Sequence, residues 1–223
     1  MSDDAFATLC SLLICLGVWG GFAAAGAALA QWRVRRVEAN LGRRAEPSEE
    51  AVQLFYAGAS VVYLGAAILA LVGLAKKDWA RTGRNCLFFF IGHITLVIAG
   101  MPFVLAQSGR EDAAAVVPIL ILACVIVGLS LLVASYFAVR WSALRTRRIE
   151  ALPATGTEPL GAVRYVIYFG SLAIWPVGLV CAAVLKEPEN VRVGATSFRL
   201  SLANFVGVGA LVCIALPFVA SSL

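Results

Sequence analysis

Residues 113–139 read AAAVVPILILACVIVGLSLLVASYFAV, a run of 27 residues without a single charged side chain. A helix needs about 20 apolar residues to cross the roughly 30 Å hydrocarbon core of a bilayer, so this run is long enough. It also lacks the alternation of apolar and polar residues that marks the strands of a membrane barrel. The run therefore predicts a membrane-spanning helix.

Five further stretches of the 223-residue chain have the same character, and all six are charge-free runs of at least 21 residues. The other five are 5–32, 51–75, 85–109, 165–185 and 200–223. Only helices and closed barrels satisfy their own backbone hydrogen bonds in lipid. We therefore predict an all-α integral membrane protein with six transmembrane helices. The connections are too short for a folded aqueous domain, so residues 1–223 are expected to form a single transmembrane bundle.

The composition excludes several classes of protein. Apolar residues make up 61% of the chain and charged residues 14%, against about 45–50% and 25% in soluble domains. A soluble enzyme, a disordered chain and a disulfide-held secreted domain are excluded. The acidic start, with Asp3 and Asp4, does not fit a cleaved signal peptide, so the first run is expected to be retained. We expect a multi-pass protein of a bacterial or organellar inner membrane, without distinguishing the two.

Two basic segments of the chain resemble each other. Residues 33–39 read RVRRVEA and residues 145–151 read RTRRIEA, so five of the seven positions are identical. At the same offset, Tyr-Ala-Gly at 56–58 aligns with Tyr-Phe-Gly at 168–170. These matches predict two three-helix repeats, in residues 1–109 and 110–223, with coincidence as the alternative. An odd number of helices in each copy places the two copies in inverted orientation.

The Lys and Arg residues do not orient a six-helix arrangement. Orientation normally follows an excess of Lys and Arg on the cytoplasmic side. With six spans, the 18 basic residues divide equally between the loops of the two faces. Inverted copies would produce such a tie, and the orientation stays open.

Small residues at four-residue spacing mark two runs as candidates for close helix packing. They are Gly17, Gly21 and Ala25 in the first run and Ala203 and Gly207 in the last. Such faces let helix backbones approach each other in lipid. Packing within the chain and docking against a partner subunit are both open interpretations. The first run has the longer face and is the better candidate for an outer contact.

The predicted helix cores carry no group equipped for catalysis or ion transport. None of the six runs contains Asp, Glu, Lys or Arg, although ionisable groups inside the bilayer are the usual marks of ion pathways and substrate sites. The six cysteines lie in these runs without the spacing of metal ligands. We therefore expect no catalytic residues and no metal site, and we do not expect an enzyme.

The chain has one histidine, His93, in the third run. We interpret it as a neutral imidazole that hydrogen-bonds to a neighbouring helix. The alternative is an axial ligand to a haem or chlorophyll macrocycle; no other cofactor is expected. If the repeats are inverted, His93 and Asn204 lie in corresponding helices and would approach each other near a twofold axis.

The basic residues beside the apolar runs are expected to contact anionic lipid. They do not form the coherent basic face that nucleic acid binding requires, so no nucleic acid partner is expected. The proposed lipid contacts are Arg33, Arg35, Arg36, Arg145, Arg147 and Arg148.

Together these features predict a non-catalytic accessory or structural subunit of a larger membrane complex, with energy-transducing complexes as candidate hosts. Its partners would be other membrane protein subunits and lipids. The alternative is a small transporter or channel, built from inverted three-helix repeats, for a neutral or lipid-like solute.

Overall fold

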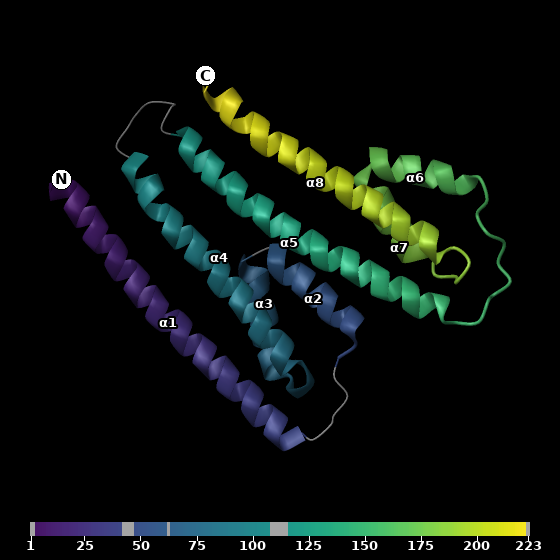
Figure 1. Ribbon diagram of the computed structural model, residues 1–223, viewed down its shortest axis with the longest axis horizontal. Coiled ribbons are helices and arrows are strands. Elements are labelled where there is room, and N and C mark those ends of the chain that lie inside the picture. The colour runs from purple at the N-terminus through teal and green to yellow at the C-terminus, as the bar shows by residue number, and fades with distance from the viewer. Residues whose placement is uncertain (1–2, 42–46, 62, 108–115, 222–223) are drawn as a thin grey trace. The chain divides into compact units, whose positions relative to one another are not determined.

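The computed structural model describes residues 3–41, 47–61, 63–107 and 116–221 (Figure 1). It is 88% helical, and its described part contains no strand, which confirms the all-α prediction. The helices are α1 (Asp3–Leu41), α2 (Glu49–Val61), α3 (Tyr63–Ala75), the short 3-10 helix η1 (Lys77–Trp79), α4 (Ala80–Gln107), α5 (Val116–Glu150), α6 (Val163–Ala173), α7 (Trp175–Val184) and α8 (Val191–Ser221).

Four segments are long and apolar enough to cross a membrane, in agreement with a membrane-spanning protein. They are Leu13–Ala39 in α1, Lys77–Met101 in η1 and α4, Ile119–Glu150 in α5 and Val191–Leu216 in α8. The second and fifth apolar runs of the sequence differ from expectation. Each is divided between two short helices, α2 and α3 with 13 residues each and α6 and α7 with 11 and 10. Six single spans are therefore not confirmed.

The break between α6 and α7 has a local cause in the sequence. Ile174 has an extended backbone, with φ −131° and ψ 102°, and its N–H ends α6 by bonding to the oxygen of Gly170. Pro176 follows in the first turn of α7. Proline lacks the N–H of a helix interior and its ring clashes with the preceding turn, so proline is favoured in the first turn of a helix over the interior.

The chain folds back between the two short helices of each run. A Cβ added at Gly170 would lie 3.7 Å from Val177 Cγ1, and one added at Gly58 would lie 3.3 Å from Leu69 Cδ1. In a straight helix these pairs would be separated by about 10 and 16 Å along the axis. The α6–α7 pair therefore has the geometry of a helical hairpin, and in the first unit the chain reverses between Gly58 and Leu69.

The chain forms two compact units. The first contains residues 1–47, 58–130 and 213–223, and the second contains residues 48–57 and 131–212. In the first unit, α1 and α4 are antiparallel, since Trp19 Nε1 donates to Thr95 Oγ1 at 3.0 Å while residues near the end of α1 contact the start of α4. Val34 and Val37 of α1 form a buried cluster with Ala80. The backbones of α3 and α4 meet where two glycines face each other.

In the second unit α5 and α8 are antiparallel. The rings of Trp141 and Phe198 meet edge to face with their centroids 5.7 Å apart. Ser201 joins three helices, because its Oγ accepts from Gly178 N–H at 3.0 Å and donates to the oxygen of Ser171 at 2.8 Å. Close approach of α7 to α8 thus depends on a glycine and a small hydroxyl side chain.

Candidate functional site

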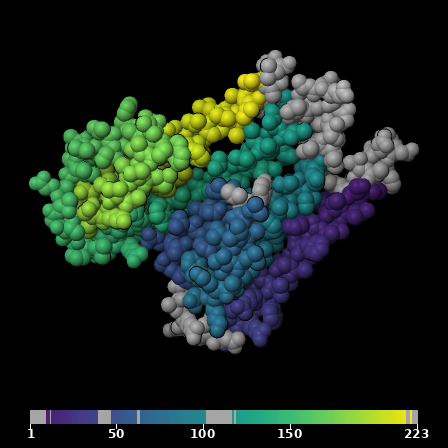
Figure 2. Space-filling view, turned by 180° about the vertical axis from the view of Figure 1, so that it is seen from behind, coloured from purple at the N-terminus to yellow at the C-terminus, as the bar shows by residue number. Residues whose placement is uncertain are grey.

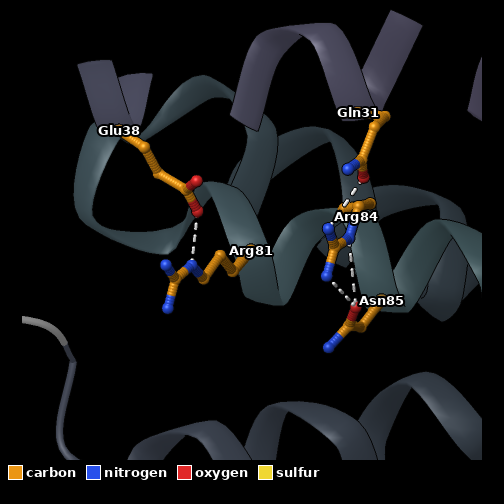
Figure 3. Close-up of polar contacts among 5 residues, drawn as sticks. All are labelled: Gln31, Glu38, Arg81, Arg84 and Asn85. Carbon is orange, nitrogen blue, oxygen red and sulfur yellow. Dashed lines mark hydrogen bonds and ion pairs between the residues drawn. The ribbon is translucent and has the colours of Figure 1, made fainter. Parts of the chain in front are cut away.

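Polar side chains connect α1 to α4 at one end of the first unit, where α1 ends and α4 begins (Figure 3). Arg81 pairs with Glu38 across the two helices, with Nε and Oε1 2.5 Å apart. Arg84 donates to Gln31 Oε1 at 2.8 Å and also contacts the side chain of Asn85. Both arginines thus hold the start of α4 against the end of α1.

In the second unit, ion pairs connect the helices near the end of α5. Arg192 near the start of α8 forms an ion pair with Glu150, the last residue of α5. Arg140 on α5 pairs with Glu49 at the start of α2, with Nη2 and Oε1 2.8 Å apart. Salt bridges again hold the polar ends of helices together.

One arginine in each unit also binds the end of a short helix. Arg33 of α1 donates to the backbone oxygen of Leu74 in α3 at 3.4 Å. Arg145 of α5 donates to the backbone oxygen of Ala182 in α7. The last four carbonyls of a helix lack partners within the helix, so each arginine satisfies a group that would otherwise need water.

The residues that make these contacts occupy equivalent places in the two basic segments of the sequence. Arg33 and Arg145 are 112 positions apart, as are Glu38 and Glu150, and their partners Arg81 and Arg192 are 111 apart. The position of Arg33 and Arg145 beside apolar runs predicts lipid contact, whereas both bind backbone oxygens of the chain. Nothing in the composition of the runs singles out the two glutamates. The repeated RxRRxEA pattern was the signal that marked these positions as equivalent.

A carboxylate anchors the long connection between α5 and α6. Glu189 accepts hydrogen bonds from Thr155 N–H at 2.8 Å, from Gly156 N–H at 3.1 Å and from the Thr155 hydroxyl at 3.0 Å. Gly156 has a φ of 76°, a backbone conformation that favours glycine. The pKa of Glu189 is lowered, first by the hydrogen bond from its own backbone amide and then by those from Thr155 and Gly156. The anionic carboxylate therefore stabilises this connection.

The predicted docking residues are not used for packing among the described residues. A Cβ added at Gly17, Gly21 or Gly207 would meet nothing within 4 Å, and Ala25 and Ala203 are exposed. Figure 2 shows α1, in purple, at the edge of its unit with an uncovered side. Other glycines do the internal packing, at Gly73, Gly83, Gly178 and Gly194. The spacing of glycines in the sequence alone does not distinguish those that pack between helices from those that face open space.

His93 has hydrogen-bond partners at both ring nitrogens, within the first unit. Nδ1 lies 2.7 Å from the oxygen of Phe89, and Nε2 lies 2.9 Å from Ser130 Oγ on α5. Ligation of a macrocycle would require breaking one of these bonds. Asn204 belongs to the second unit, and its approach to His93 stays a prediction.

The six candidate lipid arginines divide into two groups. Arg33, Arg145 and Arg148 are engaged within the chain, the last with Glu50 at 3.3 Å. The side chains of Arg35, Arg36 and Arg147 are exposed and form no ion pair or hydrogen bond with another described residue, so they remain candidates for lipid contact. Arg36 also lies over the ring of Trp32, 5.2 Å from its centroid.

No protein-family model, curated protein or solved structure matches this chain.

Proposed function

We propose that the chain is a non-catalytic, multi-pass subunit of a larger membrane assembly, and that α1 docks on an apolar helix of a partner. The observation that carries this proposal is the open small-residue face of α1, formed by Gly17, Gly21 and Ala25. An added side chain at either glycine would meet empty space within the chain. Small residues are favoured between helices in membranes because they let two backbones come close.

The orientation of α1 supports an external partner. Ala30 and Val34, each 2% exposed, lie on the side of α1 that packs within the first unit. At 3.6 residues per turn, the small face lies on roughly the opposite side of the helix from these two residues. It therefore points away from the packing of the first unit.

The distribution of charge supports a non-catalytic role. Each of the 31 formally charged side chains lies outside the six apolar runs.

We expect wild-type protein, extracted in a mild detergent, to migrate as a defined complex well above its own 23.5 kDa. Replacing both Gly17 and Gly21 by leucine fills the small face and should release the chain as a monomer. Native mass measurement and identification of co-purifying chains test this expectation.

Gly128→Leu in α5 is the matched control, because an added side chain there also meets nothing within 4 Å. It should leave the complex intact. A wild-type chain that is monomeric under these conditions, or a double leucine variant that keeps its complex, contradicts the proposal.

A second candidate is a small transporter or channel for a neutral or lipid-like solute, made of two related halves. The break at Ile174, between α6 and α7, favours it, since it interrupts the 165–185 run with extended backbone. Non-helical backbone at membrane depth is tolerated where it is buried in protein or lines a cavity, and interrupted helices are typical of transporter sites. Solute flux in liposomes that contain the purified chain alone would favour this candidate over a docking subunit.

A further inference from the structure

We propose that α2–α3 and α6–α7 are re-entrant helical pairs that enter and leave the membrane on the same face, so that the chain crosses the membrane four times. This places nearly all of its basic residues on one face and assigns its orientation. The proposal is independent of any partner or solute.

The lengths of the short helices are the first support. Helices of 13 residues rise about 20 Å, and helices of 10 or 11 residues about 15 Å. A single crossing requires about 30 Å. Neither member of a pair is long enough to cross by itself, and the two members of each pair fold back rather than add their lengths.

The ends of the second pair lie together. Leu160, just before α6, donates its N–H to Asn190 Oδ1 at 3.0 Å, and Asn190 directly precedes α8. Ala182, near the end of α7, accepts from Arg145 in the last third of α5. The start of α6 and the end of α7 therefore both lie where α5 ends and α8 begins.

The first pair has matching constraints. Gly58 of α2 contacts Leu69 of α3 within the first unit, so the chain reverses between them. Leu74, near the end of α3, accepts from Arg33 near the end of α1. Within the second unit, Glu50 at the start of α2 forms an ion pair with Arg148 near the end of α5 at 3.3 Å. The exit of α3 thus lies near the end of α1, and the entry of α2 lies near the end of α5.

The charges then become strongly asymmetric. With four spans, the polar segments that flank both helical pairs share one face, and the 108–115 connection lies on the other. Arg110 in that connection is the one basic residue outside the shared face, so 17 of the 18 Lys and Arg residues lie on one side. An excess of basic residues marks the cytoplasmic side. The equal division required by six spans disappears.

Three consequences follow for the molecule. The start of α1 and the end of α8 lie on the non-cytoplasmic face. Exposed arginines of the basic face, including Arg35 and Arg147, meet the anionic headgroups of the cytoplasmic leaflet. Each half has two full spans, so the halves have the same orientation rather than the inverted orientation expected from three helices.

Wild-type protein in sealed membrane vesicles provides a direct test, because trypsin cuts after Lys and Arg. From the cytoplasmic face, we expect cleavage in the segments 33–50, 76–84, 140–164 and 186–199. From the opposite face, cleavage should occur only after Arg110. Cleavage within 76–84 or 140–164 from the face opposite to 33–50 would overturn the proposal.

Single cysteines provide a second measurement where trypsin does not reach. In a variant whose six native cysteines are replaced by alanine, Ala39→Cys and Lys77→Cys flank the first pair, and Thr157→Cys and Lys186→Cys flank the second. A membrane-impermeant maleimide should label all four from one face and Ser108→Cys from the other. If the two cysteines that flank one helical pair are labelled from opposite faces, re-entry of that helical pair is refuted. If the cysteine-free variant does not fold, the trypsin pattern of the wild type decides.

Discussion

Gly83→Ala is expected to separate α3 from α4 and to destabilise the first unit by about 2 kcal/mol or more, within or above the usual range for overpacking a tight contact. A Cβ added at Gly83 would lie 2.5 Å from the backbone carbon of Gly73, and one added at Gly73 would lie 2.5 Å from Gly83 Cα. Real Cβ atoms do not approach backbone so closely. The measurement is unfolding of the purified protein in mixed micelles, followed by tryptophan fluorescence.

The size of the destabilisation by Gly83→Ala depends on which atoms must move to relieve the clash. When an added methyl group meets the far end of a flexible side chain, a change of rotamer relieves the clash. At Gly83 the obstacle is the main chain of another helix, which moves only if the whole helix shifts. A shift of α3 would also lengthen the hydrogen bond from Arg33 to the oxygen of Leu74, which is already 3.4 Å long.

Gly92→Ala is the matched control, since it lies in α4 and an added Cβ there meets nothing within 4 Å. Alanine has a higher helix propensity than glycine by about 1 kcal/mol, so this change should be neutral or stabilising. Gly83→Ala is therefore expected to lower the stability of the protein, whereas Gly92→Ala should leave it unchanged or raise it. Equal behaviour of both variants would contradict the close approach of α3 and α4.

The sequence predicts where the apolar helices lie but not how the short ones turn. Runs without charge identify α1, α4, α5 and α8 because length and hydropathy are sufficient to define a long span. The 165–185 run has the same composition, yet Pro176 divides it, and counting charges ignores that local signal. In the 51–75 run no proline marks the break, and the reversal is visible only in the contact between Gly58 and Leu69.

The candidate sites show the same limit. Four-residue spacing predicts close helix packing at Gly17 and Gly21, where an added Cβ meets nothing within 4 Å. It does not predict Gly73 and Gly83, where the backbones of two helices meet. Small residues permit close approach, but the position of the neighbouring helix decides which of them are used. Arginines beside a span were likewise predicted to face lipid, whereas the partner of Arg145 is a carbonyl on a helix 37 residues further along the chain.

Arg145→Ala is expected to destabilise the second unit by about 2 kcal/mol, because an unsatisfied buried polar group costs about 1–3 kcal/mol. The guanidinium of Arg145 donates to the oxygen of Ala182 and lies over the ring of Trp141, 5.6 Å from its centroid. Ala182 is 5% exposed, so water has little access to this residue once the arginine is removed. Denaturant titration in micelles measures the loss.

The position of the Ala182 carbonyl increases the destabilisation expected from Arg145→Ala. Ala182 lies in the last turn of α7, where carbonyls have no partner within the helix and where the helix dipole favours a positive charge. The nearby N–H of Leu185 is already used by the oxygen of Cys181. Arg145 thus supplies both a donor and a charge to a helix end that the local backbone does not satisfy.

Arg148→Ala removes an arginine three positions away and separates this effect from a general loss of positive charge. Its side chain is 75% exposed, and its ion pair with Glu50 spans 3.3 Å. Exposed ion pairs contribute between 0 and about 1 kcal/mol, so this variant should remain close to wild type. If both alanine variants lose the same stability, charge alone explains the result and the cap on α7 is unimportant. If only Arg145→Ala is destabilised, the end of α7 is held to α5, as the re-entrant arrangement requires.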